Sequence, residues 1–238
     1  LISPKDSEKF DSCALVISPN MSLSIKTSKE FVFFVDCSPT MIGVSIQKAS
    51  ECLLFFIKSL PSDSYFNVIR FGKKSQRFFD NSVLYNDENS EKAVRFAQNI
   101  EPDLGIPDLI SPLTEIFSEE CLYGQRQIFI ITDGNIRDKG NVLELISENS
   151  KYNRCFTIGI GEFCDTWFVE GMANASGGKS DFVQQGDSIS DKIIPQLESS
   201  FIPSITSLEF RFEGRNKDPF EFSPYPLKSV HPTNSLIA

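Results

Sequence analysis

The amino-acid sequence predicts an α/β fold, with a doubly wound, mostly parallel sheet, one antiparallel edge strand and helices on both faces. Apolar segments of strand length alternate with segments of helical period between residues 29 and 202, which is typical of parallel sheets joined by helical crossovers. The strongest apolar segments are apolar on both sides, as in strands that helices cover on both faces. Right-handed crossovers then distribute the helices over the two faces.

The central strand of this prediction is Phe31–Val35. Its five consecutive apolar residues lie between Glu30 and Asp36, so neither face of the strand is polar and it belongs in the middle of the sheet. Apolar residues then recur at steps of three and four, which predicts a helix that lies along the sheet. This helix ends before Pro61, because helical geometry is disfavoured in a residue that precedes proline. The residues expected on its buried face are Ile42, Ile46, Ala49, Leu53, Phe56 and Leu60.

The other strands and helices are predicted from the same two patterns, apolar runs of strand length and apolar residues at helical spacing. Further strands are expected at 65–71, 127–132, 155–160 and 181–183, with a short antiparallel edge strand at 76–79 whose basic residues protect it from pairing. Helices are expected at 91–99, up to about residue 120, around 142–146, at 167–173 and at about 188–201. Asn89 or Ser90 is the expected cap of the first of these helices. Trp167 is expected in the packed core.

The two ends of the chain differ from the segment between them. Residues 1–28 contain short strand candidates, and residues 203–238 contain a strand-like run at 205–212 followed by prolines without helical period. A half-exposed strand needs a partner for its apolar face, so we expect the two ends to form one small β appendage together. The main domain therefore spans residues 29–202, and residues 1–28 and 203–238 are flanking β segments.

Composition excludes several classes of function. Lysine and arginine total 23 against 32 acidic residues, a formal net charge of -9, so we expect no nucleic-acid partner, because such binding requires clustered cations. We also expect no membrane insertion, since no apolar run approaches the ~20 residues that cross a bilayer. His231 is the only histidine, which argues against a Ser-His-Asp triad and against a histidine metal site.

The cysteines indicate a compartment. Six cysteines are scattered along the chain without a Cys-x-x-Cys pair, and several fall inside apolar runs. This pattern favours buried thiols over a disulfide framework. A cytoplasmic location is therefore expected, or an extracellular one if residues that precede Leu1 carry a signal peptide.

Oxygen-bearing side chains follow the two most apolar strands. Asp36, Ser38 and Thr40 occupy alternate positions directly after the central strand, and Asp133 closes the strand 127–132. If these strands are neighbours with crossovers running in opposite directions, the two acids meet at the crevice where α/β sheets bind ligands. Carboxylates with hydroxyls and waters suit a hard cation such as Mg²⁺.

Two simpler interpretations and one enzymatic one remain open. Ser38 or Thr40 can cap the following helix, and Asp133-Gly134 is also an ordinary turn pair. The alternative function is a phosphoester hydrolase that uses Asp36 as its nucleophile. Hydrolases of this kind need a second acid two residues later, and this chain has Ser38 there.

These residues resemble a known family. Asp-x-Ser-x-Thr after an apolar strand, an amphipathic helix, and Thr-Asp-Gly closing a later strand are similar to the von Willebrand factor A domain with its metal-ion-dependent adhesion site. The segments 65–72 and 156–161, and Gly177-Gly178 followed by Phe182-Val183, resemble the A domains that follow a VIT domain. That subgroup includes inter-alpha-trypsin inhibitor heavy chains and the vault poly(ADP-ribose) polymerase.

The resemblance implies a partly degraded metal site. Asp36, Ser38, Thr40 and Asp133 match family ligands, but the remaining threonine ligand aligns with Pro107, which has no side-chain oxygen. Pro39 also replaces the glycine that the family often has between the two hydroxyls, which removes an N–H and fixes φ. Asp103 or Asp108 are the residues that could substitute through water.

The resemblance further implies a non-catalytic protein–protein interaction module. In the intact version, Mg²⁺ or Mn²⁺ keeps one coordination position open, and an acidic side chain of the protein partner completes it. In the other version the domain has lost its metal and binds its partner with the same loops. The loop residues expected to contact the partner are Pro39, Gly105, Pro107, Asp108 and Gly134.

Overall fold

The computed structural model describes residues 16–17, 29–202 and 236–237. The chain divides into two units, one of residues 25–201 and one of the chain ends, residues 1–24 and 202–238. In the second unit, β1 (Val16–Ile17) pairs antiparallel with β9 (Leu236–Ile237). The strand candidates at 23–27 and 205–212 lie outside the described residues, so the proposed domain boundaries stay a prediction.

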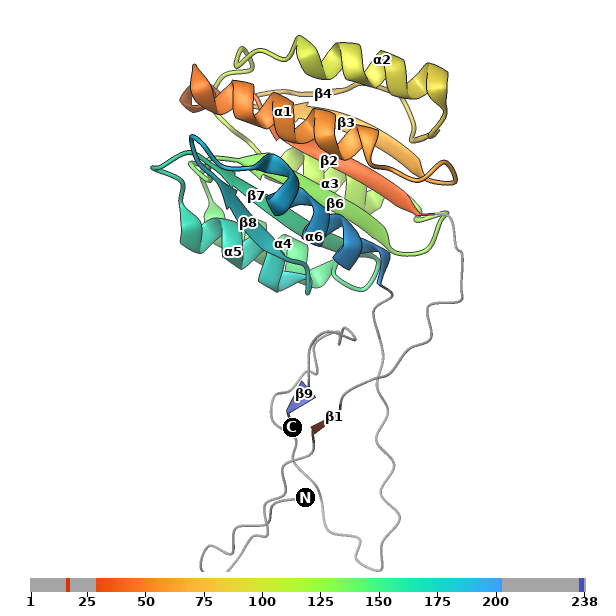
Figure 1. Cartoon of the computed structure of the whole chain (residues 1–238). Helices are drawn as coiled ribbons and strands as arrows, with labels where there is room; N and C mark the ends of the chain where they lie inside the picture. The colour runs from red at the N-terminus through yellow and green to blue at the C-terminus, as the bar shows by residue number, and fades with distance from the viewer. Residues whose placement is uncertain (1–15, 18–28, 203–235, 238) are drawn as a thin grey trace, which may run out of the picture. The chain divides into compact units, whose positions relative to one another are not determined.

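The larger unit is built on one sheet whose strand order is β4-β3-β2-β6-β7-β8 (Figure 1). Strands β3, β2, β6, β7 and β8 run parallel, whereas β4 and the short β5 pair antiparallel with β3. This confirms the predicted fold class, and β5 is an additional strand that the sequence pattern did not indicate. The strands are β2 (Glu30–Asp36), β3 (Tyr65–Phe71), β4 (Ser75–Arg77), β5 (Val83–Leu84), β6 (Arg126–Thr132), β7 (Asn153–Ile160) and β8 (Ser180–Val183).

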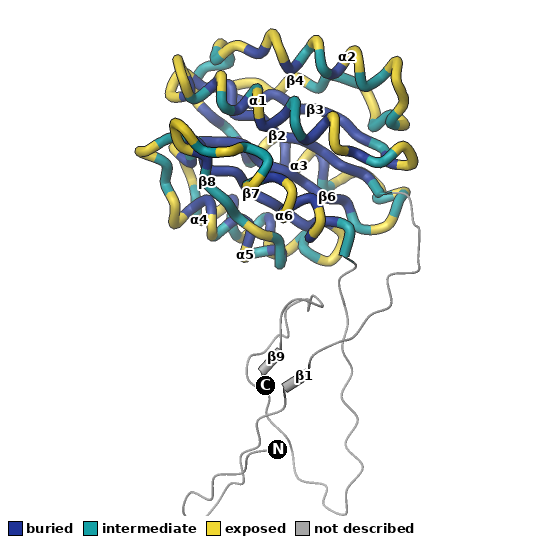
Figure 2. The backbone as a smooth tube through the Cα atoms, in the orientation of Figure 1, coloured by how far each residue is buried: buried dark blue, intermediate teal, exposed yellow. Residues whose placement is uncertain are grey.

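Helices cover both faces of the sheet, as Figure 1 shows. Phe31, Phe33 and Val35 of β2 pack on the face of α1, α2 and α6, whereas Val32 and Phe34 pack on the face of α3, α4 and α5. The central strands are buried throughout (Figure 2). The helices are α1 (Val44–Lys58), α2 (Asp87–Gln98), α3 (Ile110–Ser118), α4 (Lys139–Glu148), α5 (Thr166–Ala175) and α6 (Ile189–Phe201). Within the described residues, none of the helices has the length and hydropathy to span a bilayer.

Phenylalanines fill the core under α1. The ring of Phe56, from α1, lies 4.6 Å from that of Phe129, centre to centre, and Phe129 stacks on Phe156 at 4.8 Å. Phe33 of the central strand lies 5.6 Å from the same Phe129 ring. Aromatic rings bury large apolar areas, and such pairs add about 0.5–1.5 kcal/mol each beyond that burial. The core therefore fixes β2, β6 and β7 beside one another, and with them the loops at their ends.

Two apolar residues predicted to be buried are exposed. Ile42 is 67% exposed, because Pro39–Met41 forms a short 3₁₀ turn and Gly43, with φ 86°, breaks the chain before α1 begins at Val44. The predicted helical stripe therefore starts two residues too early. Trp167 is 65% exposed, so its assignment to the core was wrong. The buried face of α5 is formed instead by Phe168, Val169, Met172 and Ala173.

Two element ends also differ from the prediction. Helix α2 starts at Asp87 rather than near residue 91, and its cap is Asn86, whose side chain accepts a hydrogen bond from Asn89 N at 2.8 Å. Asn86 is a strong capping residue for the same reason as Asn89, so sequence alone did not distinguish them. Strand β4 ends at Arg77, and the two phenylalanines that follow it turn to pack against each other with their rings 4.5 Å apart.

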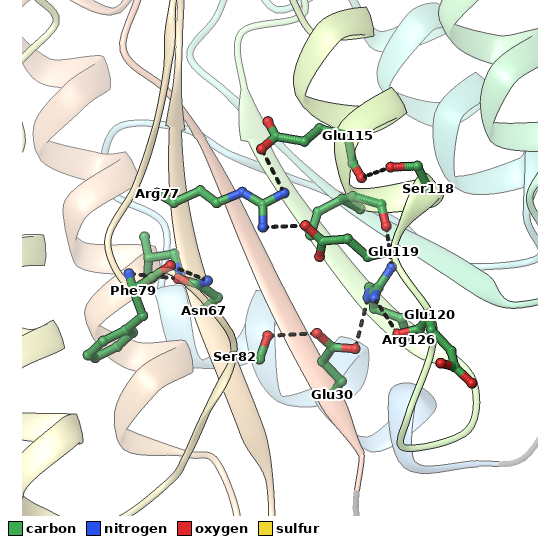
Figure 3. A network of polar contacts seen from close by, with 12 residues as sticks. Glu30, Asn67, Arg77, Phe79, Ser82, Glu115, Ser118, Glu119, Glu120 and Arg126 are labelled. Atoms are coloured by element: carbon green, nitrogen blue, oxygen red, sulfur yellow. Dashed lines mark hydrogen bonds and ion pairs between the residues drawn. The ribbon is translucent and has the colours of Figure 1, made fainter.

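A buried ion pair joins β2 and β6 at their amino ends (Figure 3). Arg126 Nε donates to Glu30 Oε2 at 2.9 Å, and Arg126 is only 1% exposed. Ser82 donates to the other oxygen of Glu30 at 2.6 Å, and Arg126 also donates to the main-chain oxygen of Ile116. Both charges are thus paired and surrounded by further hydrogen bonds, which is the condition for keeping charge in a protein interior.

Candidate functional site

The carboxyl ends of β2 and β6 form the switch point of the sheet. The two strands are parallel neighbours, with Val35 opposite Ile131. The chain leaves β2 through α1 on one face toward β3, and leaves β6 through α4 on the other face toward β7. Crossovers that diverge in this way leave a crevice above the strand ends, where open α/β sheets bind ligands. Asp36 and the Thr132-Asp133 pair lie at this edge.

Asp36 lies buried beneath the ends of β2 and β6. Its Oδ2 accepts a hydrogen bond from Thr132 Oγ1 at 2.6 Å, and its Oδ1 accepts one from Ser38 N at 2.9 Å. Burial raises the pKa of Asp36 above its ordinary value and the charge of Asp133 adds to this rise, whereas the hydrogen bonds from Thr132 and Ser38 oppose it. The site therefore holds a carboxylate in a place where a nearby positive charge would stabilise it.

The hydroxyls of Ser38 and Thr40 lie together above Asp36. The two hydroxyls form a hydrogen bond at 2.9 Å, because the 3₁₀ turn at Pro39–Met41 folds the chain directly after β2. The same two hydroxyls would provide neighbouring oxygen ligands for Mg²⁺. Neither hydroxyl makes a capping hydrogen bond, since Ser38 precedes the 3₁₀ turn without one and the N-cap of α1 is Gly43. Ser38 is buried and Thr40 is exposed, so the pair reaches from the core to the surface.

Asp133 stands beside this pair on the neighbouring strand end. Its Oδ1 accepts a hydrogen bond from Asn135 N at 2.8 Å, so Asp133-Gly134 does form a turn. Its other carboxylate oxygen makes no hydrogen bond with residues 29–202. Gly134 has φ 75°, and a side chain there would approach Asp165 to 3.1 Å. This close contact requires glycine and holds Asp133 against the start of α5.

The loop that carries Gly105, Pro107 and Asp108 is fastened to the ends of β2 and β3. Leu104 N donates to Cys37 O at 3.0 Å, and Asp108 N donates to Gly72 O at 2.9 Å. Pro107 is buried and offers no side-chain oxygen. This loop therefore has a fixed position next to the crevice but supplies no third hydroxyl.

The two acids of this loop are committed to other partners. Asp103 forms an ion pair with Arg70, whose guanidinium also donates to Glu101 O at 2.8 Å. Asp108 accepts hydrogen bonds from Ser111 N at 3.2 Å and from Ser111 Oγ at 2.5 Å, at the start of α3. Both carboxylates thus already have partners, and a role for either in place of the missing threonine stays a prediction.

The donor set suits a hard cation. Two carboxylates and two hydroxyls provide oxygen ligands of the kind that Mg²⁺ and Mn²⁺ prefer, with water completing the shell. Within the described residues no group of three histidine, cysteine or acidic side chains comes together, so the two hydroxyls are an essential part of this donor set. The sequence pattern did not single out Thr132 as a site residue, although a hydroxyl before the aspartate is the signal that could have found it.

Comparison with known proteins identifies the family. The family model described as "von Willebrand factor type A domain" matches residues 29–182. The chain belongs to this family. Domains of this family are generally protein-interaction modules, and the segment matched contains β2 to β7, most of β8 and the strand ends just described. The narrower assignment to the VIT-associated subgroup stays a prediction.

Several proteins with longer chains are similar to this chain in sequence. A von Willebrand factor A domain-containing protein of Dictyostelium discoideum is 31% identical over 90% of this chain and 23% of its own length. The von Willebrand factor A domain-containing protein 5A of Rattus norvegicus is 32% identical over 88% of this chain, and protein 5B1 of Mus musculus is 30% identical over 89%. The chain spans only 27% and 18% of the length of these two relatives.

Solved structures share the fold at low sequence identity. The protein BatB from Bacteroides thetaiotaomicron has a TM-score of 0.60 and 16% identity, over 73% of this chain and 98% of that one. The SpRpn10 VWA domain has a TM-score of 0.51 and 17% identity, over 71% of this chain and 95% of that one. These similarities establish the architecture and extend to nothing beyond it.

Proposed function

We propose that this domain is a non-catalytic interaction module that binds a protein partner at the loops above the carboxyl ends of β2 and β6, through a divalent cation in a partly degraded metal-ion-dependent adhesion site. The cation site consists of Asp36, Ser38, Thr40 and Asp133, and is called the β2–β6 site below. The observation that carries this proposal is the 2.9 Å spacing of the Ser38 and Thr40 hydroxyls above a buried aspartate.

Each residue of the β2–β6 site has a distinct part in holding Mg²⁺ or Mn²⁺. The Ser38 and Thr40 hydroxyls provide two adjacent oxygen ligands, while the Asp36 and Asp133 carboxylates supply the negative charge that favours a cation. When bound, the cation supplies a positive charge with a coordination position that an acidic side chain of the partner can occupy. Because Pro107 contributes no oxygen, we expect weaker binding of the cation than a complete site would give.

The loops around the site give the partner its contact surface. Pro39 is exposed at the tip of the β2 turn, and the half-buried Gly105 and Asp108 belong to the loop fastened beside it. Pro107 and Gly134 were predicted to contact the partner as well, but both are buried, so they position these loops instead. Gly134 holds the β6 turn in its close contact with α5. These loops remain in place without metal, because their positions depend on main-chain hydrogen bonds, so the same surface serves the version of the module that has lost its cation.

The hydrolase alternative has less support. A nucleophilic carboxylate must present an oxygen to the phosphorus atom of its substrate. Asp36 is fully buried and both of its oxygens already accept hydrogen bonds. Ser38 stands where such enzymes need their second acid. We therefore propose the interaction module rather than the enzyme.

Calorimetry with Mg²⁺ and Mn²⁺ tests the cation site. We expect saturable heat for the wild-type chain, no heat for Asp36→Ala, and at least tenfold weaker binding for Thr40→Val, which keeps the size of the side chain and removes its hydroxyl. Asp138→Asn is the matched control, because Asp138 is an exposed acid near the site with φ 54°, which asparagine tolerates. Absence of heat for the wild-type chain would mean that the β2–β6 site does not bind these cations. Turnover of a generic phosphate ester that is lost in Asp36→Asn would instead support the hydrolase.

A further inference from the structure

Two exposed aromatic side chains lie in the loop between β7 and α5 and in the first turn of α5. Phe163 is 100% exposed, and Trp167 in the first turn of α5 is largely exposed as well. They lie on either side of Asp165, which caps α5 by accepting a hydrogen bond from Phe168 N at 3.0 Å. Tryptophan is enriched among the residues that dominate binding interfaces.

Acidic residues accompany this aromatic pair. Glu162 directly precedes Phe163, and Glu170 lies about one helical turn after Trp167. Both are exposed, and neither has a salt-bridge partner within residues 29–202. The nearest lysine along α4, Lys139, is paired with Asp165. We call Glu162, Phe163, Trp167 and Glu170 the β7–α5 patch; it combines apolar area with negative charge that has no partner there.

The loop that carries the patch is held at both ends. Gly161 N donates to Val183 O at 3.0 Å, and Cys164 N donates to Gly161 O at 3.4 Å. Asp165 N donates to Asp133 O at 2.9 Å, which joins the loop to the end of β6. A surface held in this way loses little conformational entropy when a partner binds.

We propose that the β7–α5 patch is a docking surface for a basic amphipathic segment of a protein partner. The apolar face of such a segment covers Phe163 and Trp167, while its lysines or arginines pair with Glu162 and Glu170. The acidic residues argue against a membrane as the occupant, because anionic lipid headgroups repel them and the chain as a whole carries a net charge of -9. This surface uses none of the residues of the β2–β6 site, so the inference does not depend on a bound cation.

Trp167 makes this inference directly measurable, because it is the only tryptophan in the chain. The test titrates the full chain with a designed helical peptide of lysine and leucine, and separately with the same peptide in which glutamate replaces lysine. We expect the lysine peptide to move the tryptophan emission to shorter wavelengths with a saturating dependence on concentration, and the glutamate peptide to leave it unchanged. Calorimetry then gives the affinity.

Two doubly substituted proteins distinguish specific charge pairing from nonspecific attraction, and a third variant tests the apolar contact. Glu162→Lys with Glu170→Lys should weaken the lysine peptide at least tenfold and allow the glutamate peptide to bind. Glu148→Lys with Glu198→Lys changes the net charge equally through exposed residues near the ends of α4 and α6 and should have no such effect. Phe163→Ser should also weaken the peptide at least tenfold.

Four results would overturn the proposal. Two of them are equal binding of the lysine peptide to both charge-reversed proteins, and no change in tryptophan emission when that peptide is added. An emission shift with phosphatidylserine–phosphatidylcholine vesicles and none with the peptide would assign the patch to a membrane. A shift that appears on concentrating the protein alone, together with a dimer in sedimentation, would assign it to a second copy of the chain. Circular dichroism confirms that each variant is folded.

Discussion

Buried acidic residues have different partners at the two ends of the sheet. At the amino end, Glu30 and Arg126 neutralise each other, and Arg154 donates to the main-chain oxygens of Gly177 and Ser199, each at 2.8 Å. At the carboxyl end, Asp36 is equally buried but is held only by the hydroxyl of Thr132 and the amide of Ser38, without a cation among residues 29–202. The buried acid at the amino end is thus paired with a buried cation, whereas the buried acid at the carboxyl end accepts hydrogen bonds from neutral groups alone.

This difference separates stability from function along a single strand. Glu30 and Asp36 are the first and last residues of β2, so the same strand carries a compensated acid at one end and an uncompensated acid at the other. Removing one partner of a buried ion pair leaves the other charge unpaired in the interior, which strongly lowers the free energy of unfolding. An acid that only accepts hydrogen bonds from neutral groups costs less to neutralise. Substitutions at the two ends should therefore have different consequences.

The largest expected effect is at the amino end. Arg126→Met should lower the free energy of unfolding by about 3–5 kcal/mol, because Glu30 is then buried without its cation. Urea unfolding of the full chain measures this change. Arg95→Met is the matched control, since Arg95 pairs with Glu91 on the exposed face of α2 and its loss should cost about 0–1 kcal/mol.

Two further variants connect this measurement with the comparison. Glu30→Leu combined with Arg126→Met removes both charges and should be less destabilised than Arg126→Met alone. Asp36→Asn should cost about 1 kcal/mol or less, because no ion pair is lost. A loss at Asp36 as large as the loss at Arg126 would show that the two ends do not differ in the way described here.

Local sequence was sufficient to predict most of the fold. Phe31–Val35 and the other apolar runs indicate buried strands because few other arrangements bury both of their faces. The positions of Asp36, Ser38 and Thr40 were also predictable, since these residues directly follow a recognisable strand. Side-chain exposure at the ends of elements was less so, because Ile42 and Trp167 lie where a turn or a helix start reorients the chain.

Contacts between distant segments could not be derived from local patterns. Glu30 and Arg126 are 96 residues apart, and they meet because β2 and β6 are adjacent and in register. Thr132 and Asp36 have the same separation and meet for the same reason. Each of these polar residues begins or ends an apolar strand, which is a signal that a buried polar contact exists but not which residue provides it.

An intermediate effect is expected when the missing oxygen is restored at the carboxyl end. Pro107→Thr supplies a hydroxyl at the position that the resemblance aligns with the remaining ligand of the family, and should strengthen binding of Mg²⁺ about tenfold, which corresponds to about 1.4 kcal/mol. Pro107→Ala is the matched control because it removes the proline ring without adding an oxygen. Calorimetry on the three proteins measures the change. Equal gains for threonine and alanine would attribute the effect to loop freedom rather than to a ligand.

The smallest expected effect concerns Lys29, which lies at the amino end. Its Nζ donates to Ser200 O at 2.7 Å, and burial, together with the charge of Arg154, lowers its pKa from 10.5 to about 8. Between pH 8 and 10.5 the unfolded chain therefore binds more protons at this lysine than the folded chain does, so Lys29 makes stability rise with pH in that window. Below pH 8 the lysine is charged in both states, and its unfavourable contribution is constant.

Lys29→Met isolates this contribution. Buried thiols, such as that of Cys155 with its pKa raised to about 12, favour the folded state less as pH rises, and they act equally in both proteins. The difference in unfolding free energy between wild type and Lys29→Met, followed by urea unfolding from pH 7 to 10.5, should therefore shift in favour of wild type above pH 8. A difference that is independent of pH would mean that Lys29 is not desolvated.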